Sequence, residues 1–311
     1  MEIFRHWNPS VKIFPLNDDA NSKITAKRKA TVLSQALPYI KKFNNKVIVV
    51  KLGGSALADK NLILSFAHDV TWLNSVGIKV LVVHGGGPHI EKHLKKLGIP
   101  VNFFEGTRIT DSETLDVVEM VLAGNVNKEV VELINQSGGK AVGLTCQDGN
   151  LIKARKKRAK KTKNNVSVDF GLVGDVDSVN TDLLLTLMSD NFIPVVAPIA
   201  SGEEGETYNI NADVVAGKLA EYLKAEKLIL MTNTVGVLNG EGNLIPEMNG
   251  STIRDLIGKK AISEGMIPKV EAALRASELG VEAVHIIDGR VENSLLLEVL
   301  TDSGIGTMIR A

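Results

Sequence analysis

Two glycine-rich segments follow candidate β-strands and could bind phosphate. The first contains Lys51, Gly53 and Gly54, and the second contains Gly86 and Gly87. Glycine lets backbone N–H groups approach an anion closely, and the ends of parallel strands are where α/β sheets bind ligands. A tight turn would account for either segment alone. Because each segment lies between a predicted strand and a predicted helix, the pair favours a phosphate-binding site.

Two charged residues stand at the start of predicted helices. Lys269 lies in the first turn of a helix predicted over 268–279, where the positive end of the helix dipole makes a lysine unfavourable unless an anion binds there. Asp213 lies at the start of a helix predicted over 214–223 and could act as its N-cap. In the alternative interpretation, Lys51, Asp213 and Lys269 surround a phosphoryl group during its transfer.

Arg108 indicates that a carboxylate binds as well. It lies among Gly106, Thr107 and Thr110, in a segment rich in turn and cap residues and not on a helical face. A guanidinium group can bind a carboxylate through two parallel hydrogen bonds. Asn209, shortly before Asp213, is a further polar candidate at the entry to the same helix.

Short β-branched runs alternate with helical stretches from residue 46 onward, which predicts a parallel α/β sheet. The predicted strands are 47–51, 80–84, 194–198, 228–232 and 284–287, and further helices are predicted through Phe66 and Trp72 and over 88–97. A helix over 24–43 comes first, and its apolar face could pack on its own lobe or on another subunit. The basic stretch at 150–169 is expected to be an exposed hairpin or loop.

Composition limits the classes of function. The 311 residues include 36 basic and 36 acidic side chains, so no global field favours nucleic acid or membrane binding. Cys146 is the only cysteine, which excludes an internal disulfide, and it is expected to be a core residue. No apolar run of membrane-spanning length occurs, and no signal peptide is apparent, so a cytoplasmic protein is expected.

Five motifs in collinear order resemble the N-acetylglutamate kinases of the amino acid kinase family. They lie at 51–54, 84–87, 106–108, 209–213 and 266–270. The resemblance implies an α/β fold, an open three-layer αβα sandwich with a mainly parallel central sheet and two lobes. It divides the chain into an N-terminal arm and helix (1–45), an acetylglutamate-binding lobe with the dimer interface (46–225) and an ATP-binding lobe (226–311).

The family's activity is phosphorylation of the γ-carboxylate of N-acetyl-L-glutamate by ATP with Mg²⁺, in arginine biosynthesis. By resemblance, Lys51 and Lys269 neutralise the transferred phosphoryl group, Asp213 holds both lysines, and amides at Gly53, Gly54 and Gly86 donate to its oxygens. The acetylglutamate ligands are then Gly86, Gly87, Arg108 and Asn209. The nucleotide site is lined by Thr232, Val235, Gly236, Val237, Leu238, Ala261, Ile262, Ser263 and Met266.

The N-terminal helix resembles the arm of the arginine-inhibited branch, whose members pair arms into a ring of three dimers. His285, Glu298 and Gly304 fall where that branch binds L-arginine. The resemblance also admits a nitrogen-signalling protein as a partner. Glu264 departs from the family pattern by putting a negative side chain near the expected nucleotide loop.

Two alternatives remain open from the sequence. The chain could be another kinase of the same family, acting on aminoadipate, aspartate or carbamate. It could also be a non-catalytic arginine-sensing protein of the same fold, although the intact pair of Lys51 and Lys269 argues against this. This sequence has no Walker motif, so it does not indicate a P-loop enzyme.

Overall fold

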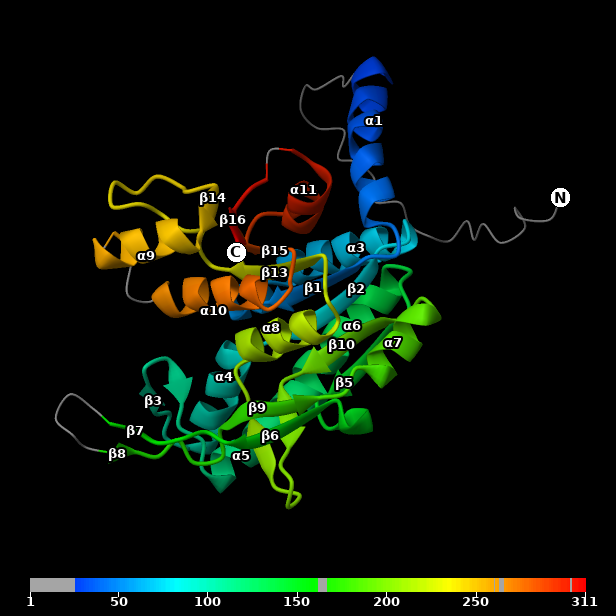
Figure 1. Ribbon diagram of the computed structural model, residues 1–311. Helices are drawn as coiled ribbons and strands as arrows, with labels where there is room; N and C mark the ends of the chain where they lie inside the picture. The colour runs from blue at the N-terminus through cyan, green and yellow to red at the C-terminus, as the bar shows by residue number, and fades with distance from the viewer. Residues whose placement is uncertain (1–25, 162–166, 260, 263–265, 303) are drawn as a thin grey trace.

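The structure is a computed structural model, and it describes residues 26–161, 167–259, 261–262, 266–302 and 304–311 (Figure 1). Ser263 and Glu264, which the sequence places near the nucleotide, lie outside the described residues. In the described part of the chain, no helix combines the length and the apolar character needed to cross a bilayer.

An eight-stranded sheet forms the centre of the molecule. Neighbouring strands follow the order β14-β16-β15-β13-β1-β2-β10-β5, and every pair is parallel except β15 with β16. The strands are β1 (Val47–Leu52), β2 (Lys79–His84), β5 (Ala141–Thr145), β10 (Ile193–Ala197), β13 (Lys227–Thr232), β14 (Glu247–Asn249), β15 (Ala283–Asp288) and β16 (Thr307–Arg310). The predicted mainly parallel sheet is therefore confirmed.

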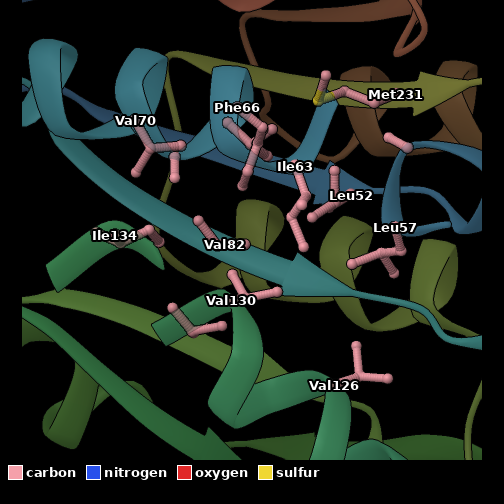
Figure 2. Close-up of a cluster of buried hydrophobic side chains, with 14 of the residues drawn as sticks. Leu52, Leu57, Ile63, Phe66, Val70, Val82, Val126, Val130, Ile134 and Met231 are labelled. Atoms are coloured by element: carbon pink, nitrogen blue, oxygen red, sulfur yellow. The ribbon is translucent and has the colours of Figure 1, made fainter. Parts of the chain in front are cut away.

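Helices cover both faces of this sheet, as Figure 1 shows. Successive side chains of a strand point to opposite faces. In β1, accordingly, Ile48 and Val50 belong to one buried apolar cluster, and Val49 belongs to the other. Figure 2 shows the first cluster, in which Phe66 and Val70 pack near Val82. The two clusters, one on each face, establish the predicted three-layer αβα sandwich.

The first cluster contains side chains from α3 (Lys60–Ser75), α4 (Gly87–Leu97), α5 (Ser112–Glu119), the π-helix η1 (Met120–Val126), α6 (Asn127–Gln136) and α11 (Ser294–Leu300). The second contains side chains from α7 (Asp182–Ser189), α8 (Ala212–Tyr222), α9 (Gly250–Gly258) and α10 (Ile267–Glu278). The one-turn helix α2 (Gly54–Leu57) follows β1 directly, and a single 3-10 turn spans Asp148–Asn150. Cys146 is fully buried in the second cluster, as predicted, and burial raises the pKa of its thiol.

A smaller sheet lies beside the central one. It consists of β6 (Ile152–Lys156), β9 (Gly174–Val179), β11 (Ile199–Ser201) and β12 (Thr207–Asn209). Two further pairs are β3 (Phe103–Phe104) with β4 (Thr107–Arg108), and β7 (Lys160–Lys161) with β8 (Ser167–Val168). The basic stretch thus contributes β6 and β7 to antiparallel pairs, and Lys156 and Lys160 form ion pairs with Asp169 and Glu105.

Helix α1 (Ala26–Phe43) projects from the body of the molecule beside α11 (Figure 1). Near its end, Phe43 is buried, and Ala36 and Ile40 pack against the first apolar cluster. Leu37 remains 49% exposed. Part of the apolar face therefore packs on its own chain, while docking of the exposed part on another subunit stays a prediction.

Candidate active site

Both predicted glycine segments lie at the carboxyl ends of central strands. A Cβ atom on Gly53 would lie 2.5 Å from the carbonyl oxygen of Met231, so a glycine is needed where the end of β1 approaches β13. Gly54 opens α2. Gly86 is the N-cap of α4, and a Cβ there would lie 2.5 Å from Cδ2 of Leu122. The predicted strand, glycine and helix order holds in both segments.

The structure brings Lys51, Asp213 and Lys269 together. Lys51 is the fifth residue of β1, Asp213 lies in the first turn of α8, and Lys269 lies in the first turn of α10. The Nζ atom of Lys51 lies 2.9 Å from Oδ1 of Asp213, and that of Lys269 lies 3.1 Å from Oδ2. The three side chains carry a net charge of +1, which suits an incoming anion.

Asp213 is not the N-cap of its helix, contrary to the first interpretation of the sequence. Asn211 caps α8, and its side chain accepts a hydrogen bond of 2.8 Å from the backbone N–H of Asp213. Because a neighbouring asparagine satisfies the helix end, the Asp213 carboxylate is available to both lysines. Burial alone would raise the pKa of Asp213, but the charges of Lys51 and Lys269 outweigh it and lower the pKa to about 2. The carboxylate is therefore ionised at neutral pH.

Arg108 lies on β4 with 7% of its surface exposed. Its Nη2 atom donates to Oε1 of Glu91 over 3.1 Å, and its guanidinium lies 4.5 Å from the centre of the Phe103 ring. The buried Nη1 atom has no hydrogen-bond partner among the described residues. A buried donor without a partner is costly, so Arg108 is prepared to bind an acceptor such as a carboxylate.

Asn209 is linked to Arg108 by hydrogen bonds that pass through Thr110. Its Nδ2 atom is 3.5 Å from Oγ1 of Thr110, whose hydroxyl in turn donates to the carbonyl of Arg108 over 3.1 Å. The backbone N–H of Thr110 donates to the carbonyl of Phe170, which is buried. Arg108 and Asn209 thus share one scaffold, and the chain from Asn209 leads directly to Asp213.

The predicted nucleotide segment starts where β13 ends at the same edge of the sheet. Thr232 donates a 3.2 Å hydrogen bond to the carbonyl of Ile287, and the buried Val237 donates its N–H to Oγ1 of Thr307 over 2.8 Å. Gly236 has φ of +140° and is closely surrounded. Val235 and Leu238 are exposed, at 43% and 38%, and could contact a ligand.

The structure describes only part of the second predicted nucleotide segment. Ala261 is partly exposed and donates its N–H to the carbonyl of Leu256, whereas Ile262 and Met266 are buried in the second apolar cluster.

A cavity of about 510 Å³ lies between α8 and α10 and has Asp213 in its wall. Lys51 and Lys269 are not among the residues that line this cavity.

The residues predicted for arginine lie away from this cluster, around β15 and α11. Nδ1 of His285 is 2.5 Å from Oε1 of Glu298, and Oε2 of Glu298 accepts the N–H of Ile305 over 2.7 Å. A Cβ on Gly304 would lie 3.2 Å from the same carboxylate. The Nζ atom of Lys227 lies 2.7 Å from Nε2 of His285, and burial lowers the pKa of that lysine to about 8.

A sequence profile of the amino acid kinase family matches residues 46–288, which is most of the chain. The chain belongs to the amino acid kinase family. Within this family it resembles an acetylglutamate kinase of Methylobacillus flagellatus, with 55% identity over 93% of this chain and 99% of the relative. It resembles an acetylglutamate kinase of Azoarcus sp. with 53% identity over 94% of this chain and 98% of the relative. These relatives confirm the resemblance predicted from the motifs.

Solved structures of the amino acid kinase fold agree with the architecture. An N-acetylglutamate synthase from Neisseria gonorrhoeae, complexed with coenzyme A and N-acetyl-glutamate, superposes with a TM-score of 0.80 at 24% identity. The match covers 91% of this chain and 63% of the synthase chain. A carbamate kinase from Giardia lamblia superposes with a TM-score of 0.61 at 18% identity. At these identities the likeness shows the fold alone.

Several residues of this amino acid kinase that shape the site are missed by sequence reasoning. Thr307 holds the predicted nucleotide segment, and Glu91 and Phe103 contact the Arg108 guanidinium. Asn127 lies against His84 at the second glycine segment. Only Asn127 has a sequence signal, because it is a polar residue on an otherwise apolar helix face.

Proposed function

We propose that this enzyme transfers the γ-phosphoryl group of ATP to the γ-carboxylate of N-acetyl-L-glutamate and forms N-acetylglutamyl 5-phosphate. The observation that carries the proposal is the pair of lysines that meet on Asp213 beside two glycine segments. The close similarity to acetylglutamate kinases supports the choice of acceptor.

The chemistry requires charge neutralisation more than proton transfer. A γ-carboxylate has a pKa near 4.3 and is already a nucleophile at neutral pH, so no general base is needed. In-line transfer then depends on positioning and on stabilising the charge of the phosphoryl oxygens. Lys51 and Lys269 supply positive charge, and Asp213 keeps both ammonium groups at the same point. The N–H groups of Gly53, Gly54 and Gly86 are the proposed backbone donors.

In this proposal, acetylglutamate binds between the β3–β4 hairpin and the second glycine segment. Arg108 receives its α-carboxylate, because the free Nη1 donor is buried there and the guanidinium lies over the ring of Phe103, 4.5 Å from its centre. Asn209, Gly86 and Gly87 complete this part of the site. A Cβ on Gly87 would meet no atom within 4 Å, so there is open space beside it.

ATP is proposed to bind at the ends of β13 and β15, against Thr232, Gly236, Val237 and the exposed Val235 and Leu238. Ala261, Ile262, Ser263 and Met266 are the proposed second wall. Mg²⁺ is part of the proposal. It commonly binds proteins through one or two carboxylates and substrate phosphates. The carboxylate at this point, that of Asp213, is already paired with two lysines, so the metal would be held chiefly by the phosphates.

We further propose regulation by L-arginine at His285, Glu298 and Gly304. The Glu298 carboxylate suits a guanidinium group. Helix α1 is close to this region, because Tyr39 donates a hydrogen bond to Asp302 just after α11. Pairing of α1 helices from different subunits would give the predicted hexamer. In the same proposal, residues 46–225 form the acetylglutamate lobe and the dimer interface, and residues 226–311 form the ATP lobe.

ADP formation in the presence of Mg-ATP and each of four acceptors tests the function. We expect ADP with N-acetylglutamate and little with aminoadipate, aspartate or carbamate. More ADP with another acceptor would make the proposed substrate wrong. The same assay at millimolar arginine tests regulation, and unchanged activity would contradict it.

A further inference from the structure

His84 occupies the last position of β2 and is fully buried. Its Nδ1 atom lies 2.9 Å from the carbonyl oxygen of the next residue, Gly85. Its Nε2 atom lies 3.1 Å from Nδ2 of Asn127. The ring therefore joins the second glycine segment to the start of α6.

The two ends of this hydrogen-bonded chain fix which nitrogen carries the proton. Nδ2 of Asn127 also lies 2.9 Å from the carbonyl oxygen of Val195, and a carbonyl can only accept, so this nitrogen must be the amide donor. The carbonyl oxygen of Leu144 lies farther away, at 3.4 Å, so the second hydrogen goes to Nε2 of His84, at 3.1 Å, which must accept because an amide nitrogen does not. The proton of the neutral ring is left on Nδ1, where the Gly85 carbonyl, again only an acceptor, receives it. Both ends require the same tautomer.

Two features of the chain around Asn127 place the Asn127 side chain against His84. The π-helix η1 ends at Val126, and Asn127 follows as the first residue of α6, with 1% of its surface exposed. Its neighbour on β5 is Gly143, where a Cβ would lie 2.0 Å from Oδ1 of Asn127. A π-helix and a strand glycine thus make room for one buried amide, and π-helical turns are frequent at functional sites.

The hydrogen bond from His84 fixes the orientation of one peptide group. The Gly85 carbonyl and the Gly86 N–H belong to the same planar trans peptide and point in opposite directions. The Gly85 N–H is held separately, over 3.0 Å, by the carbonyl of Leu52 at the end of β1. Between two glycines a peptide can rotate with little steric resistance. With its carbonyl bound to His84, this peptide presents the Gly86 N–H on the side away from the ring.

We propose that His84 is a positioning residue for phosphoryl transfer, which orients the Gly86 N–H toward the transferred group by holding the Gly85 carbonyl, and that Asn127 sets the tautomer this requires. The inference rests on the proposed function, because it gives the Gly86 N–H a ligand. Burial lowers the pKa of His84 to about 4, against the hydrogen bond to Gly85, so the ring is neutral at working pH. A neutral imidazole carries one proton on its ring nitrogens, and the hydrogen bond from Asn127 to Nε2 places that proton on Nδ1.

Two matched substitutions separate positioning from packing. In His84→Asn the side-chain amide stands at the δ position and can still donate to the Gly85 carbonyl. In His84→Gln it stands at the ε position and can bond only to Asn127. Removal of one preorganised donor costs roughly 10²–10³ in kcat. We expect His84→Gln to lose about this much, with a smaller effect on the KM for ATP, and His84→Asn to stay within about tenfold of the unsubstituted enzyme.

Thermal unfolding of both proteins is measured alongside, since both bury an amide in place of the ring. Equal kcat values for the two variants at equal unfolding temperatures would overturn the proposal, as would normal turnover of His84→Gln. If neither variant folds, ¹⁵N-histidine NMR of the unsubstituted protein decides, with the signals of the other five histidines each identified by a His→Asn substitution, including that of His93, whose Nδ1 also faces a carbonyl oxygen. A neutral Nδ1–H ring for His84 supports the proposal, and an Nε2–H ring overturns it. Absence of acetylglutamate-dependent ADP from the unsubstituted enzyme would instead contradict the proposed function, while the NMR result still reports on the ring.

Discussion

Lys51 and Lys269 contact opposite oxygens of a single carboxylate, that of Asp213, although they come from β1 and α10. Two ammonium groups so close would repel each other without the acid between them. In the proposed reaction, this arrangement keeps two positive charges in place before the phosphate arrives, so little reorganisation is needed during transfer.

Replacement of Lys51 by alanine should remove at least about 10³ in kcat while the protein stays folded, because a cation on the transferring group is worth about this much in phosphoryl transfer. The rate of ADP formation and the unfolding temperature are measured together. Lys259→Ala is the matched control, because Lys259 is exposed and its ion pair within the described part of the chain is with Asp255, one helical turn away. Near-normal turnover of Lys51→Ala would rule out the proposed role.

Arg108→Lys should raise the KM for acetylglutamate by about 10- to 100-fold, since a lysine cannot present two parallel donors to a carboxylate and a lost charged hydrogen bond costs about 1.5–3 kcal/mol. The KM for ATP should change little. Arg254→Lys, at an exposed position of α9, is the control for an arginine outside the site. A larger change in the KM for ATP than in that for acetylglutamate would contradict this assignment.

Gly236→Ala should weaken ATP binding by about tenfold or more, because backbone strain at positive φ costs about 1–3 kcal/mol. The new Cβ would lie 2.6 Å from Cδ1 of Leu244 and 2.7 Å from Oγ1 of Thr307, and the φ of +140° disfavours alanine. Calorimetric titration with ATP measures the effect. Gly240→Ala, two residues beyond Leu238 and with open space around it, is the control and should bind ATP normally. Equal affinities for the two variants would remove Gly236 from the nucleotide site.

Asp69→Asn should change how stability depends on pH. Asp69 on α3 is 1% exposed and accepts the backbone N–H groups of Leu295 and Leu296 at the start of α11. Burial raises its pKa from 3.8 to about 7, against these hydrogen bonds. Because the folded pKa exceeds the unfolded one, the stability contributed by protonation is complete below pH 3.8 and is lost as the pH rises through 7.

The unsubstituted protein should therefore lose about 3 kcal/mol more than Asp69→Asn between pH 5 and pH 8. Denaturant unfolding at both pH values measures this. Asp255→Asn, at an exposed site, should behave like the unsubstituted protein. Parallel curves for Asp69→Asn and the unsubstituted protein would show that Asp69 is charged in the folded state at pH 5.

The central strands can be predicted from the sequence because each is buried on both faces, so Val47–Leu52 and Lys79–His84 are short, mostly apolar runs. The glycine segments can be predicted for a local reason, since strand, glycine and helix follow one another directly. The predicted N-cap of α8, Asp213, is wrong by two residues, because the observed N-cap, Asn211, has the same acceptor chemistry. The sequence pattern alone does not fix a helix end to within two residues.

The contacts that hold the site could not be predicted, because they join segments far apart in the chain. The hydrogen bond between Asn127 and His84 depends on how α6 crosses the sheet, and that of Val237 with Thr307 depends on the position of β16. Asn127 does give a signal in the sequence, because it is a polar residue beside the apolar residues Val126 and Val130. A buried amide on such a stripe is a reason to search for a buried partner.

Strand β1 pairs with β2 on one side and with β13 on the other. A ribosome releases Val47–Leu52 long before Lys227–Thr232, so the nascent polypeptide carries a six-residue, mostly apolar strand with one open edge throughout that interval. Unpaired edges of this kind recruit other strands and promote aggregation. We therefore expect the growing polypeptide to depend on chaperones until residue 232 has emerged, and an N-terminal fragment ending before that residue to be insoluble.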